Sequence, residues 1–143
     1  MEGIVQKMTL LSEELIEKNL ASWQSVISRY ESFIKDNEPV NQGFLPVFGL
    51  TKKIAKSELA KLFRAGTSLF PLLISTAEKH GLGDSEPYVA IDVWRNKNTR
   101  ILYYRGQVKV TESDPCESTD VLFERLQPFL ERLWNETKGK NHA

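Results

Sequence analysis

Apolar residues recur at alternating spacings of four and three positions through residues 16–34, the most regular pattern in the chain. They are Ile16, Leu20, Trp23, Ile27, Tyr30 and Ile34. Because this spacing places all six side chains on one stripe of an α-helix, we expect a long helix over residues 12–36. Ser12 is a suitable N-cap. Pro39 favours an end shortly before it, since the residue preceding a proline avoids helical backbone angles.

This stripe is compatible with two kinds of packing. It can form the seam of a coiled coil, in which case the 12–36 helix would join two copies of the chain as a homodimer. Leu15, Val26 and Phe33 widen the apolar face, however. A wide face is more typical of a helix that packs on its own domain, and we favour that interpretation.

Residues 39–80 predict a connector followed by two shorter helices. The connector, residues 39–50, is rich in aromatic and aliphatic side chains, so we expect it to tuck against the core. The first helix is expected over residues 51–64, with apolar residues on one side and Lys53, Lys56, Lys61 and Arg64 largely on the other. The second is expected from Ser68 to His80, with a glycine just after its end.

Strand patterns begin near residue 88. Residues 88–94 and 101–104 are rich in β-branched and aromatic residues, and a polar turn separates them. Residues 108–110 predict a third short strand or a continuation of the second, depending on whether Arg105-Gly106 is a tight turn or a bulge. A last helix is expected over residues 120–138, kinked or split by Pro128, before a frayed tail at residues 138–143.

This order of elements predicts an α+β fold in a single domain over residues 1–143. It comprises a long N-terminal helix, two shorter helices, a small antiparallel meander of two or three strands, and a Pro-kinked C-terminal helix. Strands and helices do not alternate, so a parallel nucleotide-binding sheet is not expected. A chain of 143 residues with 41% hydrophobic residues is sufficient for one core.

The composition predicts a cytoplasmic protein without a membrane partner. Residues 1–7 lack a signal-peptide pattern, and no apolar run is long enough to span a bilayer. Cys116 is the single cysteine, so no disulfide can form within the chain, which is typical of a reducing compartment.

The chain lacks the sequence motifs of the common catalytic and metal-binding sites. A metal site needs several converging ligands, whereas the chain has only two histidines, His80 and His142, and one cysteine. The phosphate-loop, dinucleotide-binding, nucleophile-elbow and HExxH patterns do not occur. We therefore expect no metal and no cofactor, and the balance weighs against an enzyme.

One group of residues on the predicted hairpin leaves a hydrolase as an alternative function. Asp92 lies on the first predicted strand, and Gln107-Val108-Lys109 follows the second. An acid on one strand and such a triplet on the next resemble the core of the PD-(D/E)xK nucleases, in which acids hold Mg²⁺ and the lysine stabilises charge at the phosphate. The resemblance implies a metal-dependent hydrolase or nuclease with Asp92, Gln107 and Lys109 as catalytic residues and Glu86 as a further acid.

The match to that family covers only about twenty residues and departs from its pattern at two positions. Gln107 stands in place of the commoner acid, and no proline precedes Asp92. Alternatively, Gln107 and Lys109 lie on the solvated face of a strand, and Asp92 is a cross-strand partner of Arg105 or Lys109.

The predicted hairpin combines aromatic and basic residues, and this combination gives our preferred function. Residues 51–110 carry eleven Lys or Arg against five Asp or Glu, between two acidic ends. Arginine and aromatic side chains are frequent hot spots for protein partners and can also stack nucleobases. The signature of sheet-type RNA binders is missing, so we favour a protein partner over nucleic acid.

We therefore predict a non-enzymatic protein of the adaptor, chaperone or toxin-neutralising type. It would bind through the hairpin and the neighbouring basic helix. The expected binding residues are Trp94, Arg95, Arg100 and either Tyr103 or Tyr104. The two tyrosines cannot both face the same side of a regular strand.

Overall fold

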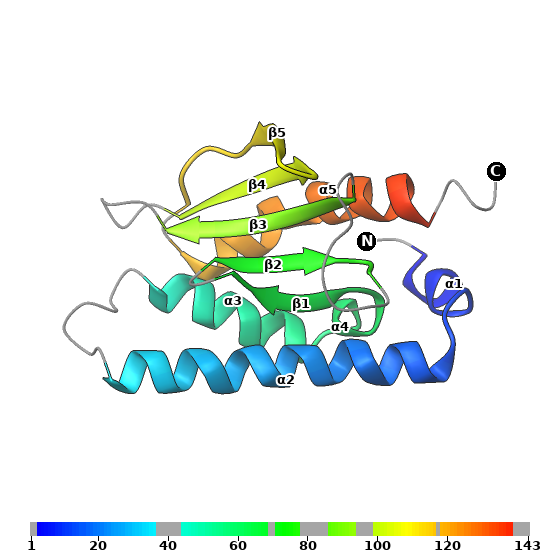
Figure 1. Cartoon of the computed structure of the whole chain (residues 1–143), viewed down its shortest axis with the longest axis horizontal. Helices are drawn as coiled ribbons and strands as arrows, with labels where there is room; N and C mark the ends of the chain where they lie inside the picture. Colours follow the sequence, from blue (N-terminus) through cyan, green and yellow to red (C-terminus); the bar gives the residue numbers. More distant parts are fainter. Residues whose placement is uncertain are drawn as a thin grey trace.

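The chain forms a five-stranded antiparallel sheet with helices packed on one of its faces (Figure 1). The computed structural model describes residues 3–36, 44–68, 71–77, 86–93, 99–116 and 118–138. The elements in chain order are α1 (Ile4–Met8), α2 (Glu13–Asp36), α3 (Leu45–Ala55), α4 (Leu59–Leu62), β1 (Arg64–Thr67), β2 (Leu72–Ser75), β3 (Pro87–Val93), β4 (Thr99–Arg105), β5 (Val108–Glu112) and α5 (Thr119–Thr137). This arrangement confirms the predicted α+β class.

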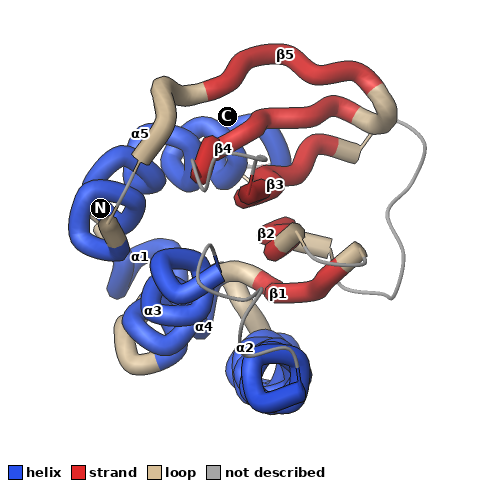
Figure 2. Tube along the Cα trace, turned by 90° about the vertical axis from the view of Figure 1, so that its left-hand side faces the viewer, coloured by secondary structure: helices blue, strands red, loops and turns tan. Residues whose placement is uncertain are grey.

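The strands follow one another in the sheet in their chain order, from β1 at one edge to β5 at the other. We call the side that faces α3, α4 and α5 the inner face, and the opposite side the outer face (Figure 2). Side chains alternate between the two faces along each strand. The inner face is fully buried at Leu72, Ile74, Val89, Ile91, Ile101 and Tyr103.

Helices α3 and α5 close the core over the inner face. Their buried side chains are Val47, Leu50 and Ile54 from α3, and Leu122, Leu126, Leu130, Leu133 and Trp134 from α5. The α5 residues recur at spacings of three and four, which keeps them on one side of the helix. Ser118 caps α5, because its Oγ accepts a hydrogen bond from the N–H of Val121 (3.2 Å).

Helix α2 lies along the β1 edge of the sheet (Figures 1 and 2). The N–H of Ala65 in β1 donates to Ser22 Oγ (2.9 Å). Just before β1, Trp23 Nε1 donates to the carbonyl of Phe63 (2.9 Å), and Asn19 Nδ2 donates to the carbonyl of Lys61 (2.8 Å). The helix thus pairs backbone groups at this edge of the sheet.

The predicted extent of the long helix is confirmed, and its start is capped as expected, since Ser12 Oγ accepts from the N–H of Leu15 (3.1 Å). Its apolar stripe is used within the domain, with Trp23, Val26 and Tyr30 buried. The described side chains on the opposite side of α2 are mostly polar or charged and exposed. A coiled-coil homodimer through this helix is therefore not supported.

The predicted helix over residues 68–80 is wrong, because residues 72–75 form strand β2. Leu72 and Ile74 are fully buried on the inner face, whereas Leu73 points to the outer face. A short apolar run is compatible with either a helix or a strand. Here pairing with β1 on one side and β3 on the other decides for a strand. The sheet consequently has five strands, not two or three.

The structure also differs from the prediction over residues 39–64, where a connector and one helix were expected. Helix α3 begins at Leu45, with Pro46 in its first turn, where a missing N–H costs no hydrogen bond. It ends near Ser57, whose hydroxyl donates to the carbonyl of Ile54 (2.8 Å) and accepts from the N–H of Leu59 (3.2 Å). These local bonds compete with the helical ones and separate α3 from the short α4.

The last helix agrees with the prediction in place and length, and it is not split. Helix α5 runs through Pro128 as one element from Thr119 to Thr137. The expected tail lies almost entirely outside the described residues. No helix in the described parts of the chain is long and apolar enough to cross a membrane.

Candidate binding surface

The middle of the outer face is a strip of small and aliphatic residues. Gly66, Leu73, Ala90 and Leu102 lie side by side across β1 to β4. A Cβ added at Gly66 would meet no atom within 4 Å, so the β1 end of this strip is open. Ala90 and Leu102, in contrast, are buried, with 5% and 4% of their surface exposed. None of the described helices packs on this face (Figure 2). We call these four residues the apolar strip.

A row of larger side chains borders the apolar strip. Tyr88 lies opposite Tyr104, which in turn lies opposite Lys109 on β5. The two tyrosine rings are stacked, with centroids 5.2 Å apart and planes 7° from parallel. Partial burial, and then the neighbouring Tyr104, raise the pKa of Tyr88 above its ordinary value, so its hydroxyl stays protonated near neutral pH. The pair therefore offers a flat, uncharged platform beside a cation.

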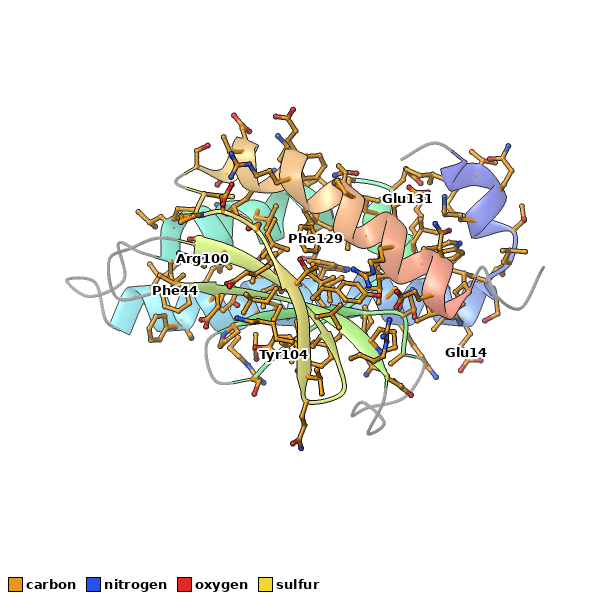
Figure 3. The ribbon with its side chains drawn as sticks, turned by 90° about the horizontal axis from the view of Figure 1, so that it is seen from above. Glu14, Phe44, Arg100, Tyr104, Phe129 and Glu131 are labelled. Carbon is orange, nitrogen blue, oxygen red and sulfur yellow. The ribbon has the colours of Figure 1, made fainter. Side chains whose placement is uncertain are left out.

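At the β5 edge, opposite Leu102, two cations share the carboxylate of Glu112. Glu112 Oε2 lies 3.6 Å from Arg100 Nη1, and Glu112 Oε1 lies 3.2 Å from Lys109 Nζ. All three side chains are a third to a half exposed, so these ion pairs add little to stability. Figure 3 shows that Arg100 and Tyr104 lie at separate places along β4.

The inner face of the same strand holds a polar cluster of a different kind. Tyr103 Oη donates to Glu136 Oε2 of α5 (2.8 Å), and the ring of Tyr103 lies 4.6 Å from the guanidinium of Arg132. Glu136 also accepts hydrogen bonds from Arg105 Nη2 and Arg132 Nε, each at 3.0 Å.

These contacts fix the charge of Glu136. Burial alone would raise the pKa of its carboxyl, but the hydrogen bonds from Arg105, Arg132 and Tyr103 outweigh burial and lower the pKa to about 2. Burial, and then the contact with Glu136, raise the pKa of Tyr103. Because the polar groups of this cluster pair with one another, we interpret it as the clamp that holds α5 against β4.

The structure divides the predicted binding residues. Arg100 and Tyr104 lie together on the outer face. Tyr103 is fully buried and its hydroxyl is engaged by Glu136, which removes it from the candidate binding residues. Trp94 and Arg95 lie outside the described residues.

The structure divides the basic residues that were predicted on the 51–64 helix. Lys53 and Lys56 lie at the end of α3, on the inner side of the sheet (Figure 2), whereas Lys61 belongs to α4 and Arg64 to β1. Lys53 and Lys56 therefore cannot contact one flat partner together with the outer face of the hairpin. Sequence reasoning counted Tyr88 among the aromatic residues of the hairpin but not among the expected binding residues, and it missed Glu112. The neighbours of both residues are set by strand register, which the composition of the hairpin does not reveal.

The residues of the nuclease resemblance do not come together. Asp92 lies opposite Arg100, and Lys109 lies opposite Tyr104, four residues farther along β4 or about 13 Å. Glu86 lies just before β3, at the end of the strand opposite to Asp92. The carboxylates and the lysine therefore do not share a cleft. The cross-strand neighbour of Asp92 is Arg100, and not Arg105 or Lys109 as the alternative interpretation expected.

The sequence left open whether Arg105-Gly106 forms a tight turn or a bulge, and the structure shows a turn. Gly106 and Gln107 form a tight turn between β4 and β5, and Gly106 has the positive φ of 63° that favours glycine. The bulge lies farther on, where the register between β4 and β5 shifts and Val110 has no opposite residue. All five residues of β5 are exposed.

This exposed edge is protected against strand addition. A bulge and a charged side chain such as Lys109 are features that natural edge strands use to prevent pairing with another chain. The outer face of the sheet is for this reason a better candidate binding surface than the β5 edge.

Comparison of the chain with protein-family models, with curated proteins and with solved structures found no match. Within the described residues, no group of three or more His, Cys, Asp or Glu side chains is placed to hold a metal ion. His80 and His142 lie outside those residues. Any functional assignment therefore depends on the geometry of the outer face.

Proposed function

We propose that this chain is a non-enzymatic protein of the adaptor, chaperone or toxin-neutralising type, which binds another protein through the outer face of the β3–β5 meander. The observation that supports this proposal most is the stacked pair of Tyr88 and Tyr104 beside Lys109, at the border of the apolar strip. Rigid aromatic side chains next to a cation are typical of interface hot spots, because they offer large contact areas at a low entropic cost.

A protein partner suits this surface better than nucleic acid does. Affinity for nucleic acid comes largely from cations that neutralise phosphates. On the outer face, however, the cations are accompanied by the carboxylates of Asp92 and Glu112, which would repel phosphates. The formal net charge of the whole chain is zero. A cytoplasmic partner would fit the free thiol of Cys116.

Affinity capture from the native cell, with mass spectrometry, tests the proposal. The bait is the full chain, compared with a Tyr88→Ala/Tyr104→Ala variant and with a Gln24→Ala/Ser28→Ala control on the exposed side of α2. Circular dichroism verifies that each bait is folded. We expect one set of proteins to be retained by the wild type and by the control but lost with the tyrosine variant. Equal capture by all three baits would argue against the outer face.

A further inference from the structure

We draw no further inference here: the strongest candidate, the half-buried pair of Tyr88 and Tyr104 on the outer face of the sheet, belongs to the binding surface already described, and nothing in the described residues shows what covers it.

Discussion

Tyr103 and Tyr104 are neighbours in the chain, but they lie on the two faces of β4 and have different surroundings. Tyr103 is fully buried between the sheet and α5, and its hydroxyl donates to Glu136. Tyr104 is half-buried on the outer face, where it stacks on Tyr88 without a helix above it among the described elements. The ring of Tyr103 is therefore part of the core, whereas the ring of Tyr104 is partly exposed.

The largest expected difference between the two faces is in the free energy of unfolding that the protein loses when each tyrosine is replaced by alanine. Tyr103→Ala removes a fully buried ring together with its contacts to Glu136 and Arg132, and it should cost about 3–5 kcal/mol in the free energy of unfolding. Tyr104→Ala loses a half-buried ring stack and should cost about 1 kcal/mol. Urea denaturation of both variants measures the difference. Equal losses would show that the outer face is also part of the core.

Gly49, which lies where two helices pack together, and Gly66, on the outer face, allow the same comparison of packing without changing an aromatic ring. A Cβ at Gly49 of α3 would collide with Thr119 of α5, whose hydroxyl also donates to the carbonyl of Pro46 (3.0 Å). Gly49→Ala should therefore cost about 1–3 kcal/mol, despite the better helix propensity of alanine. Gly66→Ala on the outer face meets no atom and should be neutral or stabilising by about 0.5 kcal/mol. Thermal unfolding of the two variants, side by side, tests this order, and a stabilised Gly49→Ala protein would contradict the close packing of α3 on α5.

The sequence allowed good predictions of elements with long, local periodicity. The stripe of α2 extends over about five turns and the apolar spacing of α5 over more than three, and β3 and β4 each contain seven residues. Strands β1 and β2 have only four residues each, so their local pattern is too short to distinguish strand from helix. Their conformation is decided by neighbours in the sheet, which no local pattern contains.

The candidate site was predictable in part for a related reason. Alternation shows that Tyr103 and Tyr104 point to opposite faces, but not which face the helices cover. That choice depends on α5, whose Glu136 lies 33 positions from Tyr103 in the chain. The row of Tyr88, Tyr104 and Lys109 likewise depends on the register of three strands and on the bulge at Val110.

The inner clamp should give a pH dependence that is centred on Glu136. Its pKa is about 2 in the folded protein, whereas an ordinary glutamate titrates near 4.5. Since the folded pKa is the lower one, the ionised carboxylate stabilises the fold above about pH 4.5, and this contribution is lost as the pH falls toward 2. After allowance for solvent screening, we expect about 1 kcal/mol.

Glu136→Gln tests this directly, because glutamine retains the shape of the side chain and cannot titrate. The difference in unfolding free energy between wild type and Glu136→Gln should be largest at neutral pH and should shrink between pH 4.5 and pH 2. Urea titrations at four or five pH values measure this trend. A difference that stays constant over that range would show that the clamp does not depend on the charge of Glu136.

The smallest expected effect belongs to Glu112, the carboxylate on the outer face. Glu112 also contacts two cations, but its ion pairs are longer than those of Glu136 and its side chain is more exposed. Glu112→Gln should therefore change the unfolding free energy at neutral pH by less than about 0.5 kcal/mol. A loss comparable to that of Glu136→Gln would instead make Glu112 a structural clamp between β4 and β5.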